Sequence, residues 1–189
     1  ESLQAKLTGG EEQALAVKAT NNPEAYDAYV RGLAFDARYS SHLDHVLDAE
    51  KAIGFYERAV QLDPNFVVAW ARLSRVNSLV YMVRYDVATA TRGDAAKRAL
   101  ENAEKLKPNS SETLLALGYY QYRVLLDYGG AKTTLGRVGK MLPSNSEVPM
   151  ALGLIARREG HWDQSIAYFE QALALDPRNV ELLTDAADI

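Results

Sequence analysis

Small and large apolar residues recur along the chain at helical spacing, and the same pattern returns before four prolines. Those prolines, Pro64, Pro108, Pro143 and Pro177, are 44, 35 and 34 residues apart. A small residue stands twelve positions before each proline, a large apolar residue eight before it, and a further apolar residue five before it. These spacings place the three residues on one face of a helix that the proline cannot continue. The pattern therefore predicts four helices, whose face residues are Ala52, Tyr56 and Ala59; Ala96, Leu100 and Ala103; Ala131, Leu135 and Val138; and Ser165, Phe169 and Ala172.

Another helix is predicted before each of these four, and each contains one small residue: Gly32, Ser74, Gly118 or Gly153. From that residue to the small residue of the following helix the distances are 20, 22, 13 and 12 residues. The first two units thus carry about 8 and 10 additional residues, around 38–47 and 82–91. Stacked helical arrays tolerate insertions in loops at one edge, so we expect edge loops at both places.

Helix pairs that repeat in phase resemble the tetratricopeptide repeat (TPR), a helix–turn–helix unit of about 34 residues. The resemblance covers residues 24–189, nearly the whole chain. It implies an all-α fold, a right-handed superhelical solenoid of antiparallel helix pairs. We expect an N-terminal helical linker or cap at 1–22 and the solenoid at 23–189, with repeats at about 24–64, 65–108, 109–143 and 144–177 and a partial repeat at 178–189.

The amino-terminal residues resemble a particular bacterial arrangement. Residues 3–32, including Asn-Pro-Glu-Ala-Tyr at 22–26 and Tyr-Val-Arg-Gly at 29–32, are similar to the TPR region of multidomain signalling proteins. Those proteins carry adenylate or guanylate cyclase, winged-helix or protein kinase domains, so the resemblance implies a fragment of a regulatory protein of that kind. The chain starts at Glu1 without an initiator Met, which also indicates a fragment. An ordinary linker followed by a capping helix is the alternative interpretation of the same residues.

Composition narrows the classes of function. The chain is 48% hydrophobic and 24% charged, which is typical of a globular protein, and its net charge of -4 disfavours binding to nucleic acid or to an anionic membrane. No apolar run approaches the roughly 20 residues of a membrane span. The absence of cysteine excludes disulfides, thiolate metal sites and cysteine nucleophiles. Composition leaves the compartment open, with the cytoplasm favoured over the periplasm.

Catalytic or metal-binding chemistry is not indicated by any motif. His42, Asp44 and His45 stand together in the first expected edge loop, but their spacing matches no zinc pattern, and a solvated loop explains them. The glycine pairs lack the Lys and Ser or Thr that follow in a phosphate-binding loop. We therefore predict a non-enzymatic chain without a cofactor or metal.

The resemblance implies that the first helix of each pair lines a concave groove in which a protein segment docks. Tyrosine and arginine, which dominate binding hot spots, are frequent there. Packing between repeats is the alternative role for the tyrosines, and compensation of the helix dipole is the alternative for arginines in a last helical turn. The predicted groove residues are Tyr26, Tyr29, Leu33, Arg72, Arg75, Tyr119, Tyr122, Arg123, Leu154, Arg157 and Arg158.

Two functions fit these observations. The first is an interaction scaffold that binds a protein or peptide segment in the groove. The second is a self-association or signal-coupling module that controls an attached cyclase, kinase or DNA-binding domain, with homo-oligomers formed through the terminal helix or the edge loops.

The sequence predicts two helix starts from their capping residues. Asn22 before Pro23 and Glu24 is typical of an N-cap followed by a first helical turn. Ser144 followed three residues later by Glu147 predicts a capping box, in which the glutamate side chain turns back to its own helix end.

Overall fold

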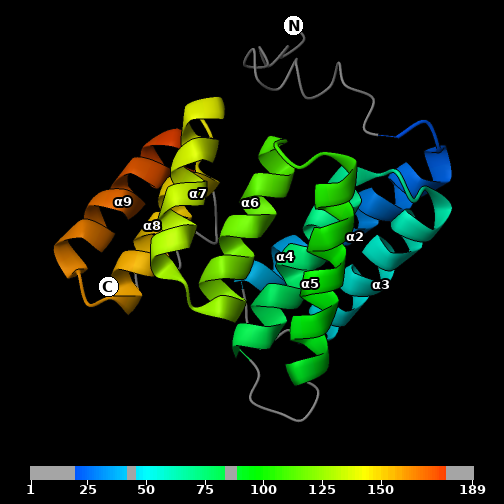
Figure 1. The fold of residues 1–189 in the computed structure, drawn as a ribbon, viewed down its shortest axis with the longest axis horizontal. Coiled ribbons are helices and arrows are strands. Elements are labelled where there is room, and N and C mark those ends of the chain that lie inside the picture. Colours follow the sequence, from blue (N-terminus) through cyan, green and yellow to red (C-terminus); the bar gives the residue numbers. More distant parts are fainter. Residues whose placement is uncertain (1–19, 42–45, 84–88, 178–189) are drawn as a thin grey trace, which may run out of the picture.

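A computed structural model describes residues 20–41, 46–83 and 89–177, and within them every regular element is a helix (Figure 1). The all-α solenoid expected from the sequence is confirmed. Most of the expected N-terminal cap, the histidines of the first edge loop and the expected partial repeat at 178–189 lie outside the described residues.

The helices of the described ranges form four successive pairs, which follow one another in chain order from right to left in Figure 1. Helix α2 (Pro23–Ser41) packs on α3 (Val46–Leu62), and α4 (Val67–Val83) packs on α5 (Thr89–Leu106). In the third pair, α6 (Ser111–Tyr120) continues into the π-helix η1 (Gln121–Leu125) and packs on α7 (Tyr128–Met141). In the fourth, α8 (Glu147–Arg158) packs on α9 (Trp162–Leu175).

The additional residues of the first two units are not confined to loops. Helix α2 has 19 residues and α4 has 17, whereas α8 has 12, so part of each insertion extends the first helix of its pair. The stretch 42–45 between α2 and α3 and the stretch 84–88 between α4 and α5 lie outside the described residues. Helix propagation adds one hydrogen bond for each residue ordered, which favours this use of the extra chain.

Close approach of the two helices in a pair explains the small residues of the pattern. A Cβ atom placed on Gly32 would lie 2.5 Å from the ring of Tyr56. Equivalent contacts would bring a Cβ on Gly118 to 2.9 Å from Leu135 and one on Gly153 to 3.0 Å from Phe169. The large residue of each second helix therefore fills the space left by the missing side chain opposite it.

The two predicted helix starts have different outcomes. Asn22 Oδ1 accepts hydrogen bonds from the backbone N–H groups of Glu24 (3.0 Å) and Ala25 (3.1 Å), which confirms the cap of α2. The capping box at α8 is wrong. The backbone N–H of Glu147 donates to Asn145 Oδ1 (3.0 Å), and the Glu147 side chain extends away from its own helix end to pair with arginines of α4.

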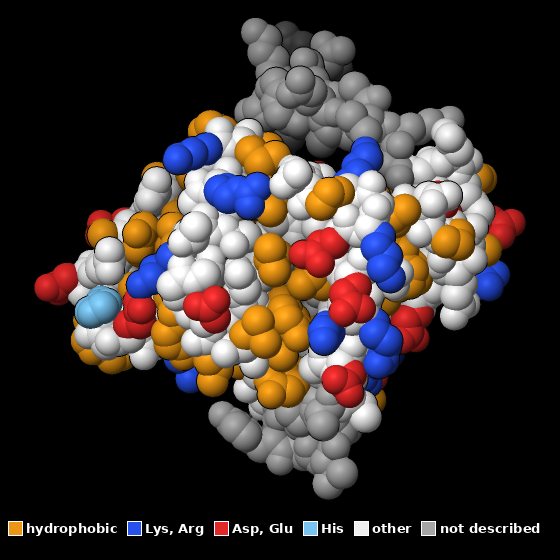
Figure 2. Space-filling view, viewed as in Figure 1, with side chains coloured by type: hydrophobic (Ala, Val, Ile, Leu, Met, Phe, Trp, Pro, Cys, Tyr) orange, Lys and Arg blue, Asp and Glu red, His pale blue; other side chains and the backbone are white. Residues whose placement is uncertain are grey.

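The apolar core consists of three buried clusters along the solenoid. One buried cluster belongs mainly to the first two pairs and another to the last two, and a smaller one around Leu100 and Tyr120 lies between them. On the face drawn in Figure 2, Lys and Arg are interspersed with Asp and Glu around a central patch of apolar side chains. No helix within the described ranges is long and apolar enough to cross a bilayer.

Candidate protein-binding site: an arginine cluster on the first helices

Three arginines meet on the side of the solenoid formed by the first helices. Arg72 and Arg75 are three residues apart on α4 and therefore lie on the same face of that helix. Arg123 comes from η1, which packs against α4. We call Arg72, Arg75 and Arg123 the arginine cluster. The ring of Tyr119 lies within it, with its centroid 4.8 Å from Cζ of Arg75 and 4.2 Å from Cζ of Arg123, both within cation–π range.

Glu147 is the main acidic partner of the arginine cluster. Its carboxylate oxygens lie 2.6 Å from Nη2 of Arg75 and 3.4 Å from Nη2 of Arg72. Glu147 is the first residue of α8, so this contact joins the fourth helix pair to the second, which is not its neighbour along the chain. The arginines thus bind a carboxylate that comes from a distant part of the same chain.

A second carboxylate approaches the cluster from the first helix pair. Asp36 on α2 lies 3.8 Å from Nη1 of Arg72 and accepts a hydrogen bond of 3.0 Å from the hydroxyl of Tyr56 on α3. Asp36 and Tyr56 are both buried. The polar network therefore contains side chains from all four helix pairs.

In this network, neighbouring opposite charges change the pKa values of Glu147 and Arg72 more than burial does. Burial alone would raise the pKa of Glu147, but the charges of Arg75 and Arg72 hold that pKa below its ordinary value. Burial would likewise lower the pKa of Arg72, yet Glu147 and Asp36 raise it. For Tyr56, burial and then the charge of Asp36 raise the pKa, so the phenol stays protonated and donates to the carboxylate.

Charge in the network is not balanced. Among the described residues, three guanidinium groups face two carboxylates, which leaves an excess of one positive charge. Arg123 is 6% exposed, and its Nη1 donates to the backbone carbonyl of Arg75 (3.5 Å). Its buried Nε has no hydrogen-bond partner among the described residues. The side chains of Arg72, Arg75 and Glu147 are 28%, 14% and 24% exposed, so solvent reaches the cluster along one edge.

Comparison with known proteins agrees with this architecture. Residues 150–179 match the sequence profile of the tetratricopeptide repeat. A solved thermophilic TPR protein from Thermus thermophilus aligns with 87% of this chain and 97% of its own, at 16% identity and a TM-score of 0.56. The solved PilF of Pseudomonas aeruginosa aligns with 89% of this chain and 69% of its own, at 23% identity and a TM-score of 0.56. The fold is a tetratricopeptide-repeat solenoid. None of the curated proteins matches the sequence.

Among the other predicted groove residues, Tyr29 on the TPR solenoid lies next to the arginine cluster. Tyr29 is half-buried beside Arg72 and packs 5.1 Å from the ring of Phe66. Exposure of the others falls into three classes: Tyr26 and Arg158 are exposed, Leu33 and Arg157 are half-buried, and Tyr122 and Leu154 are buried in the core.

This burial differs from the expectation that all the groove residues face an open surface. Tyr119, Tyr122 and Leu154 are 1%, 2% and 7% exposed, because they pack between neighbouring helices. Whether any of the predicted residues binds a partner stays a prediction.

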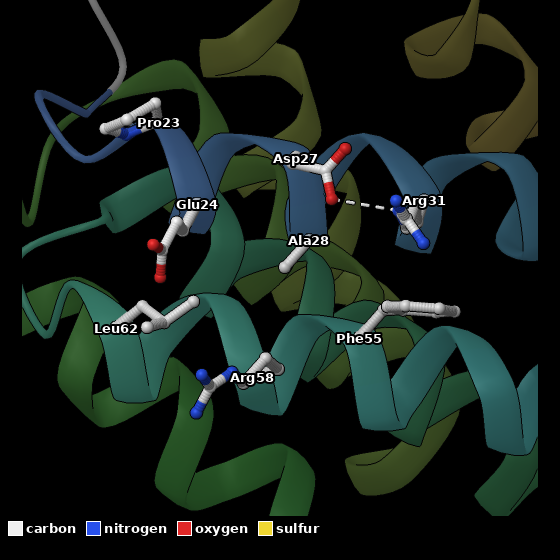
Figure 3. Close-up of a pocket in the computed structure, with 8 residues that line it drawn as sticks. All are labelled: Pro23, Glu24, Asp27, Ala28, Arg31, Phe55, Arg58 and Leu62. Carbon is white, nitrogen blue, oxygen red and sulfur yellow. Dashed lines mark ion pairs between the residues drawn. The ribbon is translucent and has the colours of Figure 1, made fainter.

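A shallow groove lies elsewhere on the TPR solenoid, between α2 and α3 (Figure 3). It encloses about 550 Å³ and is open to solvent. Asp27 and Arg31, two of its lining residues, form an exposed ion pair of 2.9 Å along α2. Its charges are mixed and solvated, so it offers less selective recognition than the arginine cluster. The described residues contain no group of three or more His, Asp or Glu side chains placed to hold a metal ion.

Glu147 and Asp36 complete the site, but Glu147 was not among the predicted groove residues. Glu147 has a local signal that favours a different role, since a Ser three residues before a Glu is typical of a capping box. Its pairing with Arg75 depends on how the TPR solenoid winds and has no signature in the sequence around either residue.

Proposed function

We propose that the chain is a non-catalytic interaction scaffold that binds a segment of another protein on its first-helix side. The observation that carries this proposal is the arginine cluster around the buried Tyr119 ring, in which the side chains of Arg72 and Arg75 are 28% and 14% exposed. Helical-repeat solenoids use the concave side of the array for binding, because many repeats present side chains to one extended ligand. Arginine and tyrosine combine apolar area with directed polar contacts, as binding hot spots require.

Affinity capture with face-specific variants tests this proposal. The first-helix variant combines Tyr26→Ala on α2 with Arg72→Gln on α4. The matched control removes the same residue types from second helices, Arg98→Gln on the exposed side of α5 and Tyr168→Ala on α9. Tyr119 is unsuitable for this purpose, because its burial means that a substitution would disturb the fold itself.

We expect a partner to be retained by the unaltered chain and the control and to be lost by the first-helix variant. Thermal unfolding of all three proteins confirms that each is folded before binding is compared. Equal capture by both variants would show that the first-helix side is not the binding surface.

Self-association or signal coupling is the second candidate. Trp162 and Ile166, one turn apart on α9, are 53% and 42% exposed, and exposed apolar pairs of this kind favour contact with another protein surface. The similarity of residues 3–32 to TPR regions of bacterial signalling proteins suggests coupling to a cyclase, a kinase or a DNA-binding domain. Light scattering of the chain alone separates the two candidates, since a monomer up to high concentration contradicts self-association.

A further inference from the structure

The arginine cluster holds a carboxylate supplied by the chain itself. We propose that Glu147 is an internal ligand of the cluster, and that acidic side chains of a partner segment bind by replacing it. This inference rests on the proposed scaffold function and specifies the chemistry of the segment that is bound.

The charge of the site favours a further anion. Arg72 contacts both carboxylates of the network and Arg75 contacts one, whereas no described carboxylate lies within ion-pair distance of Arg123. The Tyr119 ring, the carbonyl of Arg75 and the more distant charge of Glu147 offset part of the lost hydration of Arg123, but its buried Nε has no hydrogen-bond partner among the described residues. The site is therefore more favourable with additional negative charge than with Glu147 and Asp36 alone.

The position of Glu147 allows another carboxylate to replace it. It is the first residue of α8 and follows a turn at 142–146. About a quarter of the side chain is exposed, although the Oε2 atom that contacts Arg75 is itself buried. A competing carboxylate therefore reaches Arg75 after the Glu147 side chain has moved aside, and it can then form the same ion pair.

The anion that fits the arginine cluster is a carboxylate of a short protein segment. Both groups now bound are carboxylates, and guanidinium groups bind carboxylates through paired N–H donors. The chain has a net charge of -4, so an extended polyanion such as a nucleic acid would be repelled away from this local site. A short protein segment with Asp or Glu side chains is the occupant that satisfies both conditions.

A synthetic probe tests the replacement directly. The probe is a fluorescent peptide of alternating Glu and Ser with an amidated end, so that every carboxylate belongs to a side chain, and its counterpart has Gln in place of Glu. Removing the internal competitor in Glu147→Gln is expected to tighten binding of the acidic peptide by about tenfold, the effect of one charge-assisted contact. The Gln peptide is expected to bind weakly to every variant.

Matched variants make the result specific. Glu159→Gln removes a carboxylate from the other end of α8, where Glu159 pairs with Lys132 at 2.8 Å, and is expected to bind the acidic peptide as the unaltered chain does. The double variant Arg123→Gln/Glu147→Gln is expected to bind the acidic peptide without the tightening expected for Glu147→Gln alone. Should Glu147→Gln fail to fold by thermal unfolding, Glu147→Asp keeps the charge on a shorter side chain and is expected to show a smaller gain.

The proposal is overturned if Glu147→Gln binds the acidic peptide no more tightly than the unaltered chain, or if Glu159→Gln shows the same gain. Equal binding of the acidic and Gln peptides overturns it as well. These outcomes are independent of the scaffold function, because the probe is synthetic and the scaffold function is judged by capture with the face-specific variants. Loss of the scaffold function would appear as equal capture by those variants, whatever the peptide result.

Discussion

Glycine at a helix crossing is required here by space rather than by backbone conformation. Gly32 lies within α2, where the ring of Tyr56 occupies the volume of a side chain. A methyl group in Gly32→Ala would meet buried ring atoms at 2.5 Å, so the two helices must separate. We expect Gly32→Ala to lower the free energy of unfolding by about 1–3 kcal/mol, measured by urea denaturation.

Gly54 on α3 provides the matched control. It lies inside a helix as Gly32 does, but nothing is within 4 Å of the position that a Cβ would take. Gly54→Ala is expected to stabilise the chain by about 0.5–1 kcal/mol, since alanine loses less backbone entropy in a helix than glycine. If both substitutions changed stability in the same direction, close packing at Gly32 would not be the cause.

The carboxylate of Glu147 makes stability depend on pH. Its pKa in the folded chain lies below the ordinary value of a glutamate, which the unfolded chain has, because Arg75 and Arg72 outweigh the effect of burial. A depressed pKa contributes stability that is complete above the unfolded value, near 4.3, and is lost as the pH falls through the folded value. We expect the unaltered chain to lose more stability than Glu147→Gln between neutral pH and pH 3, measured by urea denaturation across that range. Parallel curves for the two proteins would contradict this.

The start of α2 is held by one side chain, which makes a prediction at the level of elements. Asn22 Oδ1 caps two backbone N–H groups, and Asn22 Nδ2 donates to the carbonyl of Leu62 at the end of α3 (3.0 Å). Asn22→Ala is expected to cost about 1–2 kcal/mol, because it exposes the helix end and releases that end from its partner helix. Hydrogen exchange at the first turn of α2 measures the effect.

Asn21→Ala is the control for the helix cap, since Asn21 is the exposed neighbour of the same type. It is expected to leave both stability and exchange in α2 unchanged. Faster exchange in both variants would show that the segment before the helix, and not the cap, sets the stability of its end.

The π-helix is the element that local sequence does not indicate. Residues 121–125 contain neither glycine nor proline, and the preceding α6 has an ordinary helical pattern. The wider turn ends at Leu126, whose φ of 56° lies in the left-handed region, and it places Arg123 beside α4. Packing of η1 against α4 is favourable enough to offset a backbone conformation that is rare in isolation.

At the scale of the whole molecule, the polar network couples helix pairs that are not neighbours. A solenoid whose repeats contact only adjacent repeats has a stability that is close to a sum of local terms. The ion pair of Arg75 and Glu147 adds a contact between the second and the fourth pair. This contact limits how far the array can open and should make its unfolding more cooperative.

A double-mutant cycle measures that coupling. Arg75→Gln, Glu147→Gln and the double variant are compared by urea denaturation. We expect a coupling energy of about 1–2 kcal/mol, because the pair is largely shielded from solvent and each partner loses its main counterion when the other is removed. Additive effects within about 0.5 kcal/mol would mean that the pair contributes no link between the two repeats.

Local sequence patterns were sufficient to locate the helices and to pair them. The period of small and large residues and the prolines that follow are local properties, so they indicate where each helix lies and which face it buries. The contacts of Gly32 with Tyr56 and of Gly153 with Phe169 are direct consequences of that pattern. The first helices could likewise be recognised as the side where tyrosine and arginine gather.

Which of those residues come into contact depends on the winding of the whole array and could not be inferred from local sequence. Arg72 and Glu147 are 75 positions apart, and their contact depends on the small rotations between successive helix pairs, summed over the array. No periodic pattern in the sequence around either residue indicates the total rotation between their helix pairs. The same winding buried Tyr119 and Tyr122, because a side chain on the inner face of one helix is covered when the next pair turns toward it. Exposure along the first helices is therefore a property of the assembled solenoid.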